Sequence, residues 1–123
     1  MKSPTPSELE ILHILWELRE AKIQEVNEKL NKIKPVGYTT TLKLMQLMHQ
    51  KELVGRRPDG KSHIYYPLVT ADETKSSLLD RFVDATFGGS RTSLMMQLLG
   101  NRKVSRDELE KIRDYLDKIE GDK

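Results

Sequence analysis

The sequence predicts a mainly α-helical protein with one small β-hairpin. Along most of the chain, apolar residues recur every three or four positions, which is the spacing of one face of a helix. One stretch near residue 60 instead combines β-forming residues with a strong turn signal. The 123 residues, of which 37% are hydrophobic, suffice for one compact domain or for a small domain with an appendage.

The first helix is predicted to begin after Thr5 and to run to about Glu20. Thr5 can cap the helix, Pro6 suits the first helical position, and Glu8 completes a capping box. The apolar residues that follow fall at helical spacing and form a broad stripe, namely Leu9, Ile11, Leu12, Ile14, Leu15, Trp16 and Leu18. A stripe of this width predicts packing on more than one side of the helix.

A second and a third helix are separated by a predicted turn. The second covers about residues 22–32 and is broken by Pro35 and Gly37, because proline disfavours helix at the preceding residue and glycine permits a turn. The third covers residues 38–51. Its first turn, Thr39–Thr41, has a low helix propensity but offers short hydroxyl and methyl groups that can approach a surface closely.

Residues 53–68 are predicted to form a two-stranded hairpin. Leu53–Arg57 and Ser62–Leu68 are the expected strands, and Pro58–Lys61 is the expected turn. Because such a hairpin is marginally stable alone, we expect it to pack against the helices.

After residue 70 the pattern becomes purely helical, with three predicted helices. Thr70 and Ser105 can cap the first and the last of them, and Gly88–Ser90 ends the first. We therefore expect two domains, with the hairpin in residues 1–70 and only helices in residues 71–123.

These C-terminal helices carry apolar faces that about 50 residues bury poorly on their own. Burial shared between two chains would resolve this, so we expect a homodimer. The expected interface consists of the apolar residues of these helices, namely Leu78, Leu79, Phe82, Val83, Phe87, Leu94, Met95, Leu98, Leu109, Ile112, Leu116 and Ile119. The alternative is that the helices fold back onto the N-terminal half of the same chain.

A block of positive charge lies in the middle of the chain. Residues 29–61 contain eight basic and two acidic residues, a net charge of +6, whereas residues 1–28 contain three basic and six acidic residues, a net charge of −3. The whole chain carries only +2. Such a block is typical of a surface that binds phosphate, and a solvated face is the alternative interpretation.

The order helix, helix, turn, helix, basic hairpin is that of a winged helix-turn-helix. In this layout the third helix enters the major groove of DNA, and the hairpin, or wing, contacts the backbone or the minor groove. The candidate DNA-binding residues lie on these two elements and are Tyr38, Thr39, Thr40, Lys43, Gln46, Arg56, Arg57, Lys61 and His63. The alternative is a winged-helix module that binds another protein and no DNA.

Other classes of function find little support. The chain has no cysteine, which excludes disulfides and thiolate metal sites. His13, flanked at helical spacing by Glu10 and Glu17, is better interpreted as part of an ion-pairing face than as a metal ligand. No phosphate-binding loop or acid–base constellation is present, so we expect neither catalysis nor a cofactor. Without a signal peptide or a membrane-spanning run, the expected location is the cytoplasm.

Several segments are similar, in order and spacing, to those of a known family. They are Pro6–Leu12 with Trp16, Tyr38–Met48 followed by Lys51–Val54, Arg56 and Gly60–Lys61 ahead of Tyr65–Pro67, and Phe87–Ser90. They resemble the penicillinase repressor family, the BlaI, MecI and CopY type of winged-helix transcriptional repressor. The resemblance covers about residues 5–120.

The resemblance implies a homodimeric repressor that binds a palindromic operator in double-stranded DNA. In the antibiotic-resistance members of the family, a membrane sensor protease triggers cleavage in the C-terminal part of the repressor and so releases the DNA. Such a protease is therefore a candidate partner, and the release signal would act on the C-terminal region.

The sequence departs from the family pattern in three ways. The copper-responsive members carry a cysteine cluster that this chain lacks. The Asn-Phe bond that is cleaved in the resistance repressors corresponds here to Gln97-Leu98, which argues against cleavage by the same protease. Leu42 and Leu47 replace polar or basic residues that are common on the reading helix of the family, so the operator sequence does not transfer.

Overall fold

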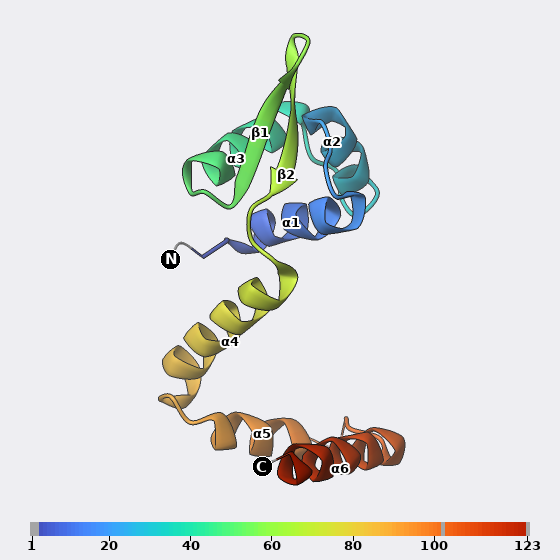
Figure 1. Ribbon diagram of the computed structural model, residues 1–123, viewed down its shortest axis with the longest axis vertical. Coiled ribbons are helices and arrows are strands. Elements are labelled where there is room, and N and C mark those ends of the chain that lie inside the picture. Colours follow the sequence, from blue (N-terminus) through green and yellow to red (C-terminus); the bar gives the residue numbers. More distant parts are fainter. Residues whose placement is uncertain (1–2, 102, 123) are drawn as a thin grey trace. The chain divides into compact units, whose positions relative to one another are not determined.

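Six helices and one β-hairpin make up the part of the chain that the computed structural model describes, residues 3–101 and 103–122. In chain order the elements are α1 (Pro6–Leu18), α2 (Ile23–Asn31), α3 (Tyr38–Gln50), β1 (Val54–Asp59), β2 (Ser62–Pro67), α4 (Ala71–Phe87), α5 (Arg91–Gly100) and α6 (Arg106–Gly121) (Figure 1). The predicted fold class is therefore confirmed. The chain divides into two units, Met1–Leu78 and Leu79–Lys123, and this boundary falls inside α4.

Helix α1 begins with the capping box that the sequence predicts. The Glu8 amide donates to Thr5 Oγ1 over 3.2 Å, and the Thr5 amide donates to Glu8 Oε1 over 2.9 Å. The helix ends at Leu18, earlier than the predicted Glu20. Arg19 has a positive φ of 74°, and its amide donates to the Leu15 carbonyl to close the last turn.

A tertiary contact follows the end of α1. Ala21 forms an isolated antiparallel bridge with Tyr65 of β2, in which each amide donates to the carbonyl of the other residue at 2.9 and 2.8 Å. The connection between α1 and α2 thus pairs with the two-stranded hairpin at this one residue. Because this pairing requires extended backbone at Ala21, the chain has to leave the helical conformation before that residue.

The core of the first unit lies between α1, α2, α3 and the base of the hairpin. Its buried apolar residues are Ile11, Leu12, Ile14, Leu15, Ala21, Val26, Leu30, Met45, Met48, Leu53, Val54 and Tyr65. Trp16 packs at the edge, and its indole Nε1 donates to the Val69 carbonyl over 2.9 Å. This bond ties α1 to the chain that leaves the hairpin.

The hairpin is longer and its turn is tighter than the sequence predicts. Pairing runs from Val54 opposite Pro67 out to Asp59 opposite Ser62, so the expected turn residues Pro58 and Asp59 belong to β1. Only Gly60-Lys61 form the loop. Gly60 has φ +63°, and glycine with positive φ at the first of two loop residues is typical of a type II′ turn. Pro58 is tolerated because β1 is an edge strand that needs no further donor.

In the second unit, helices α5 and α6 bury no residue at all. Their ends are well capped: Ser90 accepts from the Ser93 amide, and Ser105 forms a capping box with Glu108. Phe87 and Leu94 of this unit are half-buried. Most of its other large apolar side chains are exposed, namely Leu79, Phe82, Met95, Met96, Leu98, Leu99, Leu109, Ile112, Tyr115, Leu116 and Ile119. Local capping therefore sets the ends of these helices, whereas their apolar faces have no cover within one chain.

Val83 differs from the other apolar residues expected at a dimer interface. Its side chain is only 1% exposed in a single chain. It therefore has almost no surface left to lose to a partner within the conformation of a single chain, and its expected place at the interface stays a prediction.

Candidate nucleic-acid interface

Helix α3 divides into a buried face and an exposed face. Thr41, Met45 and Met48 are fully buried, and Leu44 is partly buried against the same core. The exposed residues are Tyr38, Thr39, Thr40, Lys43, Gln46, Leu47 and Gln50. From Thr39 onwards they follow the 3.6-residue period of a helix and so form one continuous stripe. We call these seven residues the α3 face. It contains all five α3 residues that the sequence analysis selected for DNA binding.

The turn before α3 is held by two asparagines that the sequence analysis did not select. The side-chain amide of Asn27 donates to the Val36 carbonyl over 3.1 Å and to Thr41 Oγ1 over 2.8 Å. Asn31 donates to the same carbonyl over 2.9 Å and accepts from the Val36 amide at 3.1 Å. These bonds fix the start of α3 to α2. Two asparagines four residues apart on α2, just before a Pro–Gly turn, are the signal that could have found them.

The far end of α3 is held by an ion pair with α1. Lys51 Nζ lies 2.7 Å from Glu8 Oε1, and the Glu8 side chain is only 2% exposed. A buried carboxylate requires such a partner, because an uncompensated charge is costly to desolvate. Lys51 therefore serves the fold, and it does not add to the phosphate-binding charge that the sequence composition suggests.

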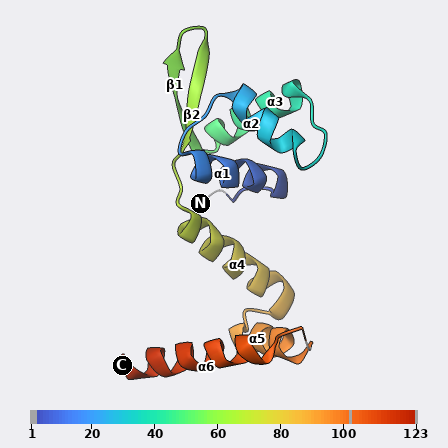
Figure 2. The ribbon, with the colours of Figure 1, turned by 90° about the vertical axis from the view of Figure 1, so that its right-hand side faces the viewer.

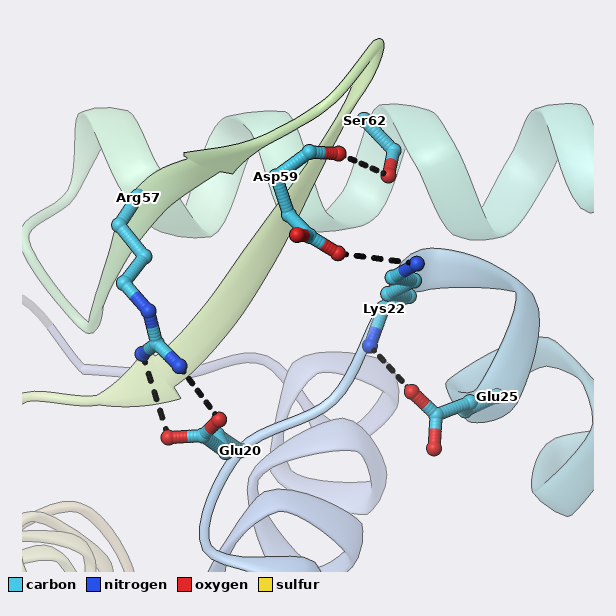
Figure 3. A network of polar contacts seen from close by, with 6 residues as sticks. All are labelled: Glu20, Lys22, Glu25, Arg57, Asp59 and Ser62. Carbon is cyan, nitrogen blue, oxygen red and sulfur yellow. Dashed lines mark hydrogen bonds and ion pairs between the residues drawn. The ribbon is translucent and has the colours of Figure 1, made fainter.

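Glu20 and Lys22, in the connection between α1 and α2, hold the wing by two ion pairs (Figure 3). Arg57 makes a two-pronged contact with Glu20, with Nη1–Oε1 at 3.2 Å and Nη2–Oε2 at 2.6 Å. Lys22 Nζ lies 3.0 Å from Asp59 Oδ2. Both strand residues point to the same face of the hairpin because they are two positions apart. Hydrogen bonding to Arg57 lowers the pKa of the Glu20 carboxyl below its usual value.

The other wing residues selected from the sequence have different surroundings. Arg56 Nη1 donates to the hydroxyl of Tyr65 over 3.4 Å, and the His63 ring packs edge-on against the Tyr65 ring at a centroid distance of 6.4 Å. Lys61 is exposed at the loop, and no ion pair to it or to Lys43 occurs among the residues that the structure describes. Figure 2 shows this hairpin extending beyond α1, α2 and α3.

A match to a known protein family identifies the family of this chain. A family model described as Penicillinase repressor matches residues 4–118. The chain belongs to the penicillinase repressor family. The resemblance noted in the sequence is thus confirmed, and so, at the level of the family, is the prediction of a transcriptional repressor.

The relatives of this penicillinase repressor family member match it over nearly the whole chain. The methicillin resistance regulatory protein MecI of Staphylococcus aureus (strain N315) is 26% identical over 112 residues, covering 91% of both chains. The penicillinase repressor of Staphylococcus aureus is 24% identical and covers 92% of this chain and 90% of that protein. The transcriptional regulator BlaI of Mycobacterium tuberculosis (strain ATCC 25618 / H37Rv) is 28% identical, with 90% and 80% covered.

Solved structures similar to this penicillinase repressor family member are winged-helix regulators of the MarR family. A MarR family protein from Bacillus stearothermophilus has a TM-score of 0.56 at 18% identity and covers 98% of this chain and 76% of that chain. A mutant MarR from E. coli, solved in complex with operator DNA, has a TM-score of 0.51 at 15% identity, with 94% and 75% covered. At these identities the similarity shows the fold alone.

Two further findings concern other kinds of site in this family member. In the described part of the chain, none of the helices has the length and apolar character that crossing a bilayer requires. Among the same residues there is no group of three or more histidine or acidic side chains that could hold a metal ion. His13 instead packs edge-on against the Trp16 ring at 5.2 Å.

Proposed function

We propose that this penicillinase repressor family member is a cytoplasmic homodimer that represses transcription by binding a palindromic operator in double-stranded DNA. The single observation that carries the proposal is the α3 face. It presents threonine, lysine and glutamine side chains to solvent along a helix whose opposite face forms the core. In a winged helix-turn-helix, this is the surface that enters the major groove.

The α3 face and the wing have separate roles in this proposal. Thr39, Thr40 and Gln46 offer hydroxyl and amide groups that can hydrogen-bond to base edges. Lys43 and Tyr38 contact phosphates beside the groove. On the wing, Arg56, Lys61 and His63 are proposed to contact the sugar–phosphate backbone. Arg57 is less available for such a contact because its guanidinium donates to the Glu20 carboxylate. Phosphate contacts supply affinity and register, whereas base contacts supply specificity.

A second copy of the chain is the proposed partner of the C-terminal helices. On α6, Leu109, Ile112, Leu116 and Ile119 form one apolar stripe that is 36–51% exposed. Such a stripe on an otherwise charged helix favours burial against another protein surface. A two-fold dimer would also present two copies of α3 about 34–36 Å apart, which matches successive major grooves on one side of DNA.

We further propose that the release signal acts on the C-terminal unit. Gln97 and Leu98, at the family cleavage position, are exposed on α5. A protease needs extended backbone, so cleavage here would require local unfolding of α5, in which no residue is buried within a single chain. A membrane sensor protease is thus a candidate partner even though the Asn-Phe bond is absent.

The experiment is a titration of DNA from the upstream region of the gene, repeated at several salt concentrations. The logarithm of the association constant should fall linearly with the logarithm of salt concentration, with a slope of about −0.9 for each phosphate contacted. Lys43→Ala and Lys61→Ala should each weaken binding and reduce that slope by about one unit per half-site. Lys75→Ala, an exposed lysine on α4, is the matched control and should behave as the wild type.

The alternative, a winged-helix module that binds a protein, predicts a different result. Binding to upstream DNA would be absent, or it would be independent of salt. Equal affinity of all three lysine variants would contradict the proposed docking even if binding itself were observed.

A further inference from the structure

Leu47 is an apolar residue in the middle of the polar α3 face. Its side chain is 39% exposed, whereas Met45 and Met48 beside it are fully buried. A single exposed leucine is ordinary on a protein surface. The position of Leu47 is less ordinary, because it lies one helical turn after Lys43, next to Gln46, and one turn before Gln50, all of which are exposed.

Packing of the core of the first unit does not explain why residue 47 is a leucine. The buried side of α3 is filled by Thr41, Met45 and Met48, with Leu44 packed against them, and Leu47 is not part of this cluster. A polar residue would serve solubility better at this position. The exposed leucine is therefore available for a contact that one chain alone does not make.

The chemistry of the major groove restricts that contact. Base edges there present hydrogen-bond donors and acceptors, and the one apolar group is the C5 methyl of thymine. Leucine can neither donate nor accept a hydrogen bond, so a guanine or cytosine edge packed against it would lose water without gaining a partner. A thymine methyl loses nothing and gains apolar burial.

We propose that Leu47 is a specificity-determining residue that reads a thymine methyl in each half of the operator. This rests on the proposed function, in which the α3 face enters the major groove. Leu47 lies seven positions after Thr40, which is about 10 Å along the helix axis. The thymine should therefore lie at a different base pair from the base that Thr40 approaches.

The test uses DNA selected from a random-sequence library by the purified full-length protein. In the selected sequence, each thymine is replaced in turn by deoxyuridine, which keeps every hydrogen-bonding group and lacks only the methyl. For the wild type, replacement at one position per half-site should weaken binding about fourfold, the value expected for one buried methyl group. Leu47→Ala should bind the thymine sequence more weakly and should show no further loss with deoxyuridine at that position.

Two control variants separate Leu47 from other sources of the effect. Leu68→Ala removes a 55% exposed leucine after β2, away from the α3 face, and should keep the full deoxyuridine effect. Thr40→Ser removes a methyl group that could also contact thymine, and it too should keep the effect at the Leu47 position. Thermal unfolding should be the same for Leu47→Ala and the wild type, since Leu47 lies outside the core cluster.

The outcomes distinguish this inference from the proposed function. A selection that returns no preferred sequence contradicts operator binding itself, and with it the role of Leu47. A preferred sequence in which no thymine is sensitive to deoxyuridine overturns the role of Leu47 and leaves operator binding standing. The same follows if Leu47→Ala loses as much affinity as the wild type at the sensitive thymine.

Discussion

At the scale of single residues, the ion pair between Arg57 and Glu20 limits the availability of the Arg57 guanidinium for a DNA phosphate. Both prongs of its guanidinium are directed to Glu20, and both side chains are 48% exposed. An exposed ion pair of this kind contributes little to stability. Its larger effect is on the wing, because a phosphate must compete with Glu20 for the same guanidinium. Hydrogen bonding to Arg57 lowers the pKa of the Glu20 carboxyl below its usual value, so this carboxylate is charged at neutral pH.

Glu20→Gln should therefore strengthen DNA binding several-fold and make it more salt-dependent, because Arg57 becomes available for a phosphate. The measurement is the salt-dependent titration described above. Glu17→Gln is the matched control, since it removes the same charge from α1 but releases only Lys29, which is paired with Glu17 at 3.4 Å. An equal gain from both variants would show that overall charge, and not the Arg57 contact, is responsible.

At the scale of elements, the orientation of α3 depends on the turn before it. Asn27 connects α2 to the Val36 carbonyl and to the hydroxyl of Thr41, a fully buried residue on α3. Without Asn27, that hydroxyl would keep only a 3.4 Å contact to the Gly37 carbonyl. The turn therefore couples stability to the placement of the α3 face.

Asn27→Ala should destabilise the first unit by about 1–3 kcal/mol, the usual cost when a buried polar group loses its partner. DNA binding should also weaken at temperatures where the variant is still folded, because the start of α3 is less restrained. Chemical unfolding followed by Trp16 fluorescence measures the first effect, and titration of DNA measures the second. Gln24→Ala, an exposed amide on the same helix, should change neither, and an Asn27→Ala variant as stable as Gln24→Ala would rule out this role of the turn.

At the scale of the whole molecule, the chain has one unit with a core and one that lacks cover for its apolar faces. Trp16, the sole tryptophan of the sequence, packs at the edge of the core of the first unit, whereas no residue of α5 or α6 is buried. A helix of this kind gains most of its stability from packing and not from its own hydrogen bonds. Association with a second copy would supply that packing.

Phe82→Asp combined with Leu116→Asp should therefore convert the expected dimer to a monomer. Both side chains are about half exposed in one chain, at 49% and 51%, so the first unit should stay folded. Sedimentation measures the mass, and Trp16 fluorescence reports the state of the first unit. Lys118→Asp places aspartate two residues after Leu116, about 200° round the helix, and should remain dimeric. A double variant that still sediments as a dimer would contradict the assigned interface.

The sequence by itself determined the features that depend on near neighbours. The caps at Thr5 and Ser105 and the apolar stripes of the helices act within one or two turns of chain, and they predicted the helices with small errors at the ends. The exposed side of α3 followed from the same periodicity. These features could be predicted because a helix relates residues only three or four positions apart.

Only the tertiary structure decided which basic residues near the candidate site form ion pairs within the protein. Glu8 pairs with Lys51 across 43 positions and Glu20 with Arg57 across 37, and neither pair follows from any local pattern. The bridge between Ala21 and Tyr65 follows from no local pattern either. A charge count treats every lysine and arginine alike, whereas the fold brings carboxylates to Lys29, Lys51 and Arg57 of the basic block. Lys43, Arg56 and Lys61 are the lysines and arginine proposed to meet phosphate.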